Sequence, residues 1–216
     1  MRKLLRGILE FRRTRREAQR ATFPQLVLGQ KPDALLIGCS DSRVAVNWFA
    51  SVDPGDLFVV RNVGNLVPPY EYTDAGSPAA AVEFALESLK VRDIIVCGHS
   101  DCGAMQALSA GRDKVSTPRL RDWLTHGSTG AATLPLEDDP ALAPHNQLSQ
   151  RNVLLQLAHL TAYPSVEQAL AAGTVRLHAW WFDIGELEVS VYDEGRTRFV
   201  PIDEEVGPRL LATLEE

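Results

Sequence analysis

The stretch LLIGCSDSR, Leu35 to Arg43, decides how this chain folds. An apolar run of strand length stops at a Gly-Cys pair, and small or charged residues follow it. The run predicts a buried strand over 34–37 that ends by presenting a thiol, a carboxylate and a guanidinium, from Cys39, Asp41 and Arg43. We expect this strand end to form the mouth of a functional site.

A second stretch, DIIVCGHSDCGA from Asp93 to Ala104, repeats the arrangement. Its continuous β-branched run is typical of a strand covered on both faces in a parallel sheet. Gly98 then interrupts the run, and His99 and Cys102 follow. Because sites in open α/β sheets form outside the carboxyl ends of the strands, we expect these two side chains to approach Cys39.

Cys39, His99 and Cys102 form a ligand set for zinc, because two thiolates and an imidazole suit a tetrahedral borderline cation. Three protein ligands leave a fourth position, as in catalytic zinc sites. The alternative for each residue taken alone is a buried thiol or a hydrogen-bonded core histidine. The occurrence of the same pattern at two strand ends favours the metal site.

Asp41 and Arg43 decide the state of the fourth position. If Asp41 also ligates the metal, the site is closed. If Arg43 holds Asp41 in a bidentate pair, the fourth position is open and Asp41 can accept a hydrogen bond from zinc-bound hydroxide. The alternative is a surface ion pair, which contributes little free energy.

Strand and helix patterns alternate along most of the chain, which predicts an α/β fold with right-handed crossovers. Strands are predicted at 34–37, 57–61 and 93–97, and helices at 44–49, 77–89, 103–126 with a break near 117, and 147–160. Near the end, runs at 175–184, 187–192 and 198–200 predict strands joined by tight turns. We therefore predict a central, mainly parallel β-sheet flanked by helices, with antiparallel C-terminal edge strands and an N-terminal helical arm.

A chain of 216 residues, 45% apolar and 23% charged, fits a single globular domain over 1–216. We divide it into an N-terminal helical arm at 1–30, an α/β core at 31–200 and a C-terminal tail at 201–216. No apolar run approaches the roughly 20 residues of a membrane-spanning helix, and nothing indicates a nucleic-acid partner. Three cysteines without a secretory signal indicate a reducing compartment, so we expect a cytoplasmic protein.

The first 20 residues are strongly basic. They contain eight Lys or Arg and two Glu, a charge of +6, which leaves −12 on the remainder of a chain whose total is −6. Leucine and isoleucine at positions 4, 5, 8 and 9, followed by Phe11, predict an amphipathic helix that packs on something through its apolar face. The alternatives are a transit peptide, or a helix that lies on a membrane or grips an acidic partner.

At these residues the chain resembles the β-carbonic anhydrases, through CSDSR at Cys39–Arg43 and GHSDCGA at Gly98–Ala104. GDLFVVRNVGNLVPPY, GSPAAAVEFAL and LHAWWFDIGELEV extend the resemblance to roughly residues 20 to 195. It implies reversible hydration of CO2 to bicarbonate and a proton by zinc-bound hydroxide, with one Zn²⁺ per subunit. In that reading Cys39, His99 and Cys102 are the zinc ligands, and Asp41 and Arg43 are the catalytic dyad.

The resemblance also implies a homodimer or homotetramer whose N-terminal helix wraps the partner, with the active site at the subunit interface. Members with an open zinc carry a Gln, aromatic residues and a Val in the substrate pocket. The matching positions here are Gln30, Phe58, Val63 and Phe84, with Gly103 after the last ligand. Phe84 stands where many members have Tyr, so no hydroxyl is expected there.

Another subgroup of the family is inhibited by bicarbonate bound beside the dyad, through a Trp, an Arg and a Tyr. The matching positions here hold Leu36, Arg61 and Phe182, and only the Arg agrees. We therefore expect an open site without a bicarbonate inhibitory pocket. We interpret Cys97, inside the predicted third strand, as a core thiol.

Two alternatives to carbonic anhydrase activity remain open from the sequence. The first is hydrolysis of CS2 or COS with the same ligands and dyad. The second is a non-catalytic, zinc-stabilised interaction module in which Asp41 permanently closes the site. A cytoplasmic enzyme of this family could also work inside a carboxysome or beside a bicarbonate transporter.

Overall fold

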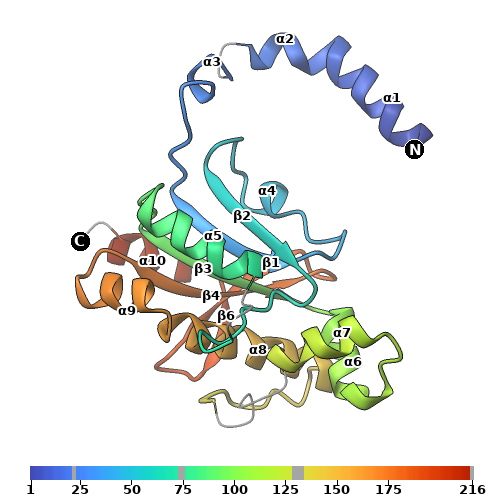
Figure 1. Ribbon diagram of the computed structural model, residues 1–216, viewed down its shortest axis with the longest axis vertical. Coiled ribbons are helices and arrows are strands. Elements are labelled where there is room, and N and C mark those ends of the chain that lie inside the picture. The colour runs from blue at the N-terminus through green and yellow to red at the C-terminus, as the bar shows by residue number, and fades with distance from the viewer. Residues whose placement is uncertain (21–22, 73–75, 128–133, 215–216) are drawn as a thin grey trace. The chain divides into compact units, whose positions relative to one another are not determined.

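A computed structural model describes residues 1–20, 23–72, 76–127 and 134–214 (Figure 1). The chain divides into two compact units, Met1–Lys31 and Pro32–Glu216. The second unit contains the β-sheet and both motifs singled out above. Each unit is described by itself.

Within the described residues, the second unit contains a six-stranded sheet in the order β2-β1-β3-β4-β5-β6. The strands are β1 Ala34–Cys39, β2 Leu57–Asn62, β3 Asp93–His99, β4 Arg176–Asp183, β5 Glu188–Asp193 and β6 Arg198–Pro201. The first four strands in this order pair in parallel, and β5 and β6 are added antiparallel at the edge. The predicted fold class is confirmed.

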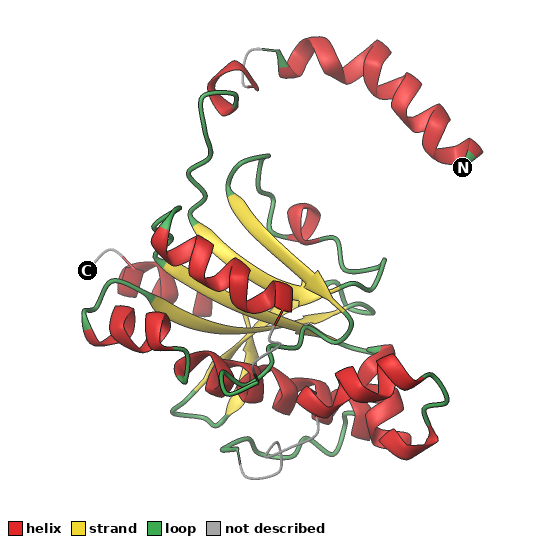
Figure 2. Cartoon of the chain, in the orientation of Figure 1, coloured by secondary structure: helices red, strands yellow, loops and turns green. Residues whose placement is uncertain are grey.

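Helices cover both faces of this sheet (Figure 2). On one face lie α5 Gly76–Glu87, α8 Pro144–Thr161 and α9 Pro164–Ala171, and on the other lies the short helix α4 Val46–Phe49. The larger core forms on the first face, where Leu35 and Ile37 of β1 pack with Val82 of α5 and Val153 of α8. Every residue of β1 is buried, as its uninterrupted apolar sequence predicts for a central strand.

The parallel register brings the carboxyl ends of β1, β2 and β3 to one edge of the sheet. Cys39 pairs with Asn62, and Gly38 pairs with Cys97, one residue before the glycine that interrupts β3. Further short helices follow β3, namely α6 Gly103–Ala110, η2 Arg112–Lys114, α7 Pro118–Trp123 and η3 Leu124–Gly127. The predicted break near 117 thus falls immediately before α7.

The N-terminal unit is helical, as predicted for its first 20 residues. It consists of α1 Arg2–Glu10, a π-helical turn η1 Phe11–Arg15, α2 Arg16–Gln19 and α3 Phe23–Leu26. The predicted apolar face, residues 4, 5, 8, 9 and 11, is 46–66% exposed in the isolated chain. This unit therefore presents an apolar surface that its own helices do not cover.

The C-terminal segment contains a helix that the sequence analysis did not assign, α10 Val206–Leu214. Gly207 and Pro208 obscure its pattern, although Pro is compatible with the first turn of a helix. The Asp203 carboxylate accepts the backbone N–H groups of Glu205 and Val206, at 2.9 and 2.8 Å, and so starts the helix. Among the described residues, no helix combines the length and apolar character needed to cross a membrane.

Candidate metal centre

The three predicted ligands meet at the carboxyl edge of the sheet. Cys39 is the last residue of β1, His99 is the last residue of β3, and Cys102 immediately precedes α6. Their ligand atoms lie within 4.8 Å of one another, with 4.0 Å between the two Sγ atoms. All three residues are buried, although 63 positions separate the two cysteines in sequence.

The donor set fits a tetrahedral cation such as zinc. His99 Nδ1 lies 2.8 Å from the carbonyl oxygen of Ser100, a bond that places the proton on Nδ1 and leaves the Nε2 lone pair free. Nε2 is buried and has no hydrogen-bond partner in the described part of the chain, which is costly unless another group binds it. Two thiolates on one tetrahedral zinc lie about 3.8 Å apart, close to the observed separation.

The two thiols share a hydrogen bond that separates their acidities. The bond from Cys102, with smaller contributions from His99 and the backbone N–H of Gly64, lowers the pKa of Cys39 against the effect of burial. The same bond, together with burial, raises the pKa of Cys102. Because thiolates rather than thiols bind metal ions, a cation bound at this pair would displace the thiol protons.

Asp41 and Arg43 form a bidentate pair beside Cys39. Arg43 Nε donates to Oδ1 at 3.0 Å and Nη2 donates to Oδ2 at 2.8 Å. These bonds hold the pKa of Asp41 well below its usual range. Arg43 Nη2 also donates to the backbone carbonyl of Asp101, 3.0 Å away, so the guanidinium joins both motifs.

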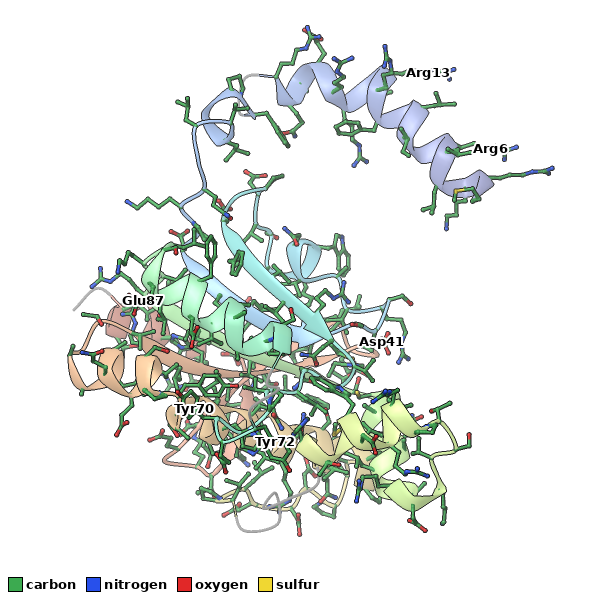
Figure 3. All side chains as sticks on the ribbon, in the orientation of Figure 1. Arg6, Arg13, Asp41, Tyr70, Tyr72 and Glu87 are labelled. Carbon is green, nitrogen blue, oxygen red and sulfur yellow. The ribbon has the colours of Figure 1, made fainter. Side chains whose placement is uncertain are left out.

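Asp41 lies at the functional edge of the sheet. Figure 3 shows it where β1 and β2 end, whereas Glu87, at the end of α5, lies toward the opposite edge. A cavity of about 290 Å³ opens beside Asp41, and its lining includes Cys39, Val63 and Gly103. The structure thus brings two of the predicted pocket residues next to the ligands.

The other predicted pocket residues do not line this cavity. The rings of Phe58 and Phe84 pack together, with centroids 5.7 Å apart. Phe58 pairs in register with Leu35, four residues before Cys39, or about 13 Å along the strand. Gln30 belongs to the N-terminal unit and is exposed.

Arg61 has a role that the sequence analysis did not find. Its Nε donates to the Cys39 carbonyl at 2.9 Å, and its Nη2 donates to the Asp41 carbonyl at 2.6 Å. The residue therefore clamps the backbone that carries the first ligand and the dyad carboxylate. Residue type and spacing do not show this role, because it depends on the strand register that places Arg61 opposite Gly38.

Cys97 lies apart from this cluster. It is fully buried on the α4 face of the sheet, in an apolar cluster with Leu36 and Phe182. Burial raises the pKa of its thiol to about 12. The interpretation of Cys97 as a core thiol agrees with this environment.

Known proteins resemble the chain over nearly its whole length. A family model described as carbonic anhydrase matches residues 34–189. A carbonic anhydrase of Pseudomonas aeruginosa is 39% identical, over 94% of this chain and 93% of that protein, and carbonic anhydrase 1 of Escherichia coli O157:H7 is 37% identical over 98% and 96%. The solved β-carbonic anhydrase CcaA superimposes with a TM-score of 0.82 at 38% identity, covering 94% of this chain and 92% of that one. Tetrameric β-carbonic anhydrases of Sordaria macrospora superimpose with a TM-score of 0.73 at 31% identity, covering 88% and 95%.

Proposed function

The chain belongs to the β-carbonic anhydrase family, and on that premise we propose that it hydrates CO2 reversibly at a zinc ion held by Cys39, His99 and Cys102. The observation that carries the proposal is the buried Cys-His-Cys cluster, with an unpartnered His99 Nε2, beside a cavity and a carboxylate. Zinc supplies Lewis acidity that generates a nucleophile from water at neutral pH.

Residues around the cavity orient the attacking water and hold CO2. Asp41, which lines the cavity, accepts a hydrogen bond from the attacking water and so directs its lone pair toward CO2. Arg43 keeps that carboxylate ionised and fixes its plane through two hydrogen bonds. Val63 and Ala107 provide apolar surface for CO2 in the same cavity.

We assign the open form of the site to this protein. Zinc and Arg43 compete for the Asp41 carboxylate, and the bidentate bond satisfies both of its oxygens on the guanidinium. The bond from Arg43 to the Asp101 carbonyl fixes the guanidinium in turn. This arrangement supports a fourth metal position that is available to water.

Three other residues argue against an inhibitory bicarbonate pocket. Leu36 and Phe182, at the positions of the required Trp and Tyr, are both buried in one apolar cluster. Arg61, the remaining match, already donates to two backbone carbonyls. A titration or crystal structure with bicarbonate bound at Arg61, and Asp41 on the metal, would overturn this assignment.

We propose that the enzyme is a homodimer or homotetramer assembled through its N-terminal helix. The exposed apolar face of α1 and η1 supplies the contact surface, and the Sordaria macrospora relatives are tetrameric. In an assembly with its site at the subunit interface, Gln30, Phe58 and Phe84 would complete the pocket of a neighbouring subunit. That assignment explains why the two phenylalanines lie away from Cys39 in their own chain.

Stopped-flow measurement of CO2 hydration with a pH indicator, at pH 7 to 9 and with the zinc content measured, tests the proposal. Cys39→Ala should lose metal and activity together, whereas Cys97→Ala, which alters a buried thiol outside the ligand set, should keep both. A zinc-loaded protein no faster than buffer would remove the proposed activity. Hydrolysis of CS2 or COS by that protein would replace it with the runner-up function.

A further inference from the structure

Helix α8 buries polar side chains where a helix packed on a sheet normally buries apolar ones. Ser149, Asn152 and Gln156 are 1%, 0% and 0% exposed, and Asn146 precedes them by one turn. Their spacing of three or four residues places all four on one face of the helix. A helix at 147–160 was predicted from the sequence, but no role was predicted for its inner polar residues.

The first half of this polar stripe holds the loop that carries the second and third ligands. Asn146 Oδ1 accepts the backbone N–H of Asp101 at 2.7 Å, and Ser149 Oγ donates to the carbonyl of His99 at 2.8 Å. Asp101 has a left-handed backbone, with φ of +53°, and lies directly before Cys102. The bond from the Asp101 N–H to Asn146 therefore fixes a left-handed residue between two ligands.

The second half of the stripe holds the loop behind the first ligand. Asn152 Nδ2 donates to the carbonyl of Gly64 at 3.1 Å, and the Gly64 N–H in turn donates to Cys39 Sγ at 3.4 Å. Gln156 donates to Asn152 Oδ1 at 2.9 Å and accepts the backbone N–H of Val67 at 2.7 Å. Asn152 and Gln156 are thus each hydrogen-bonded to the loop behind Cys39, and also to one another.

We propose that Asn146, Ser149 and Asn152 are positioning residues of the metal centre. Through them, α8 fixes the loops that carry the metal ligands before the metal binds. This inference rests on the metal site proposed above. Buried amides and hydroxyls are costly unless they are hydrogen-bonded, so α8 can dock on the sheet only when both loops hold the observed conformation. A docked α8 therefore implies correctly placed Cys39 and His99.

Zinc affinity, measured by competition with a chelator, tests the proposal in the full chain. Asn152→Leu retains side-chain volume but loses the bond to Gly64. Leu154→Ala, on the same helix, lowers stability by removing core packing, and the leucine side chain makes no hydrogen bond to either loop. We expect Asn152→Leu to bind zinc about 10-fold more weakly than Leu154→Ala, the lower end of the effect of residues that orient metal ligands.

A second pair of variants decides the question even if Asn152→Leu fails to fold. Asn146 lies at the half-buried start of α8. Asn146→Ala should weaken zinc binding, whereas Asn146→Asp retains an oxygen for the Asp101 N–H and should restore the affinity of the parent.

The absorption spectrum of the cobalt-substituted protein gives a second readout. The thiolate-to-cobalt bands should shift in Asn152→Leu, or in Asn146→Ala, and not in Leu154→Ala. Parental zinc affinity and an unshifted spectrum in every folded stripe variant, or equal weakening in Leu154→Ala, would overturn the inference. A parent chain that binds zinc but does not hydrate CO2 would remove the proposed activity and leave this comparison intact.

Discussion

Among the glycines that the structure describes, Gly98, beside the candidate metal centre, has the least room for a side chain. A Cβ atom there would lie 2.6 Å from Val153 Cγ2 and 3.3 Å from the backbone oxygen of Ser149. We expect Gly98→Ala to lower the free energy of unfolding by about 1–3 kcal/mol, because the stiff valine and the helix backbone must shift. Urea denaturation measures the change. Gly7→Ala, where nothing lies within 4 Å, should be neutral or stabilising; equal losses in both variants would contradict the packing argument.

Arg43 is the residue that should decide whether the fourth metal position is open. In Arg43→Gln the two bonds to Asp41 are lost, and the released carboxylate can compete for the metal. We expect CO2 hydration to fall about 10–100-fold while zinc content stays constant. Arg43→Lys keeps the positive charge but not the planar guanidinium, so its rate of CO2 hydration should lie between those of the parent and Arg43→Gln. Parental rates in Arg43→Gln would exclude a gating role.

At the scale of elements, Asp93 joins β3 to β4 at the edge opposite the metal centre. Its carboxylate accepts bonds from Arg176 at 2.8 and 2.9 Å and lies 2.7 Å from His178 Nε2. Burial alone would raise the pKa of Asp93, but these bonds bring it below its usual 3.8. Because the pKa of Asp93 is lower in the folded chain than in the unfolded chain, its ionised carboxylate stabilises the fold at any pH above the unfolded pKa. This stabilisation is lost as the pH falls through the folded pKa.

Asp93→Asn should therefore have a lower free energy of unfolding than the parent at pH 7. We expect a difference of about 1–2 kcal/mol, because this ion pair is half-buried and its contribution should lie between those of exposed and fully buried pairs. The difference should shrink as the pH falls below 3.8, because the parent also loses its carboxylate charge. Denaturant titrations at several pH values measure it. Glu87→Gln, in an exposed pair with Lys90, should change little at any pH. A difference in the free energy of unfolding between the parent and Asp93→Asn that stays constant with pH would show that the charge of Asp93 is not its cause.

Elements with a long, uniform pattern could be predicted from the sequence. The apolar runs at β1 and β3 predicted the parallel core, and the polar residues that end them predicted the candidate ligands Cys39, His99 and Cys102, which the structure brings together. The hydrogen bonds that position those residues could not be predicted. Arg61 of β2 binds two backbone carbonyls at and just after the end of β1, and Asn152 binds a loop 88 positions away. Such bonds depend on three-dimensional register, which residue type and local spacing do not encode.

At the scale of the whole molecule, the apolar face of the N-terminal unit should control assembly. A charge at its centre, as in Leu5→Glu, should convert an oligomer into chains of 23.8 kDa, because the buried carboxylate would lack a partner. Light scattering after gel filtration measures the mass. Arg6→Glu introduces the same residue on the polar side of α1, labelled in Figure 3, and should keep the oligomer. A parent that already runs as a single chain would rule out this mode of assembly.

The pairing of β1 with β3 also sets when, during folding, the two thiols of the candidate metal centre first meet. Contacts between residues 63 positions apart form late, because the loop between them must close before the contact offsets its entropic cost. Until the strands pair, Cys39 and Cys102 move independently, and an ion that bound both would have to close the same loop. We therefore expect metal uptake to mark the completion of folding, in contrast to small zinc domains that fold around the ion. On this view the chain should fold before it binds the ion, and activity should follow when the ion is supplied.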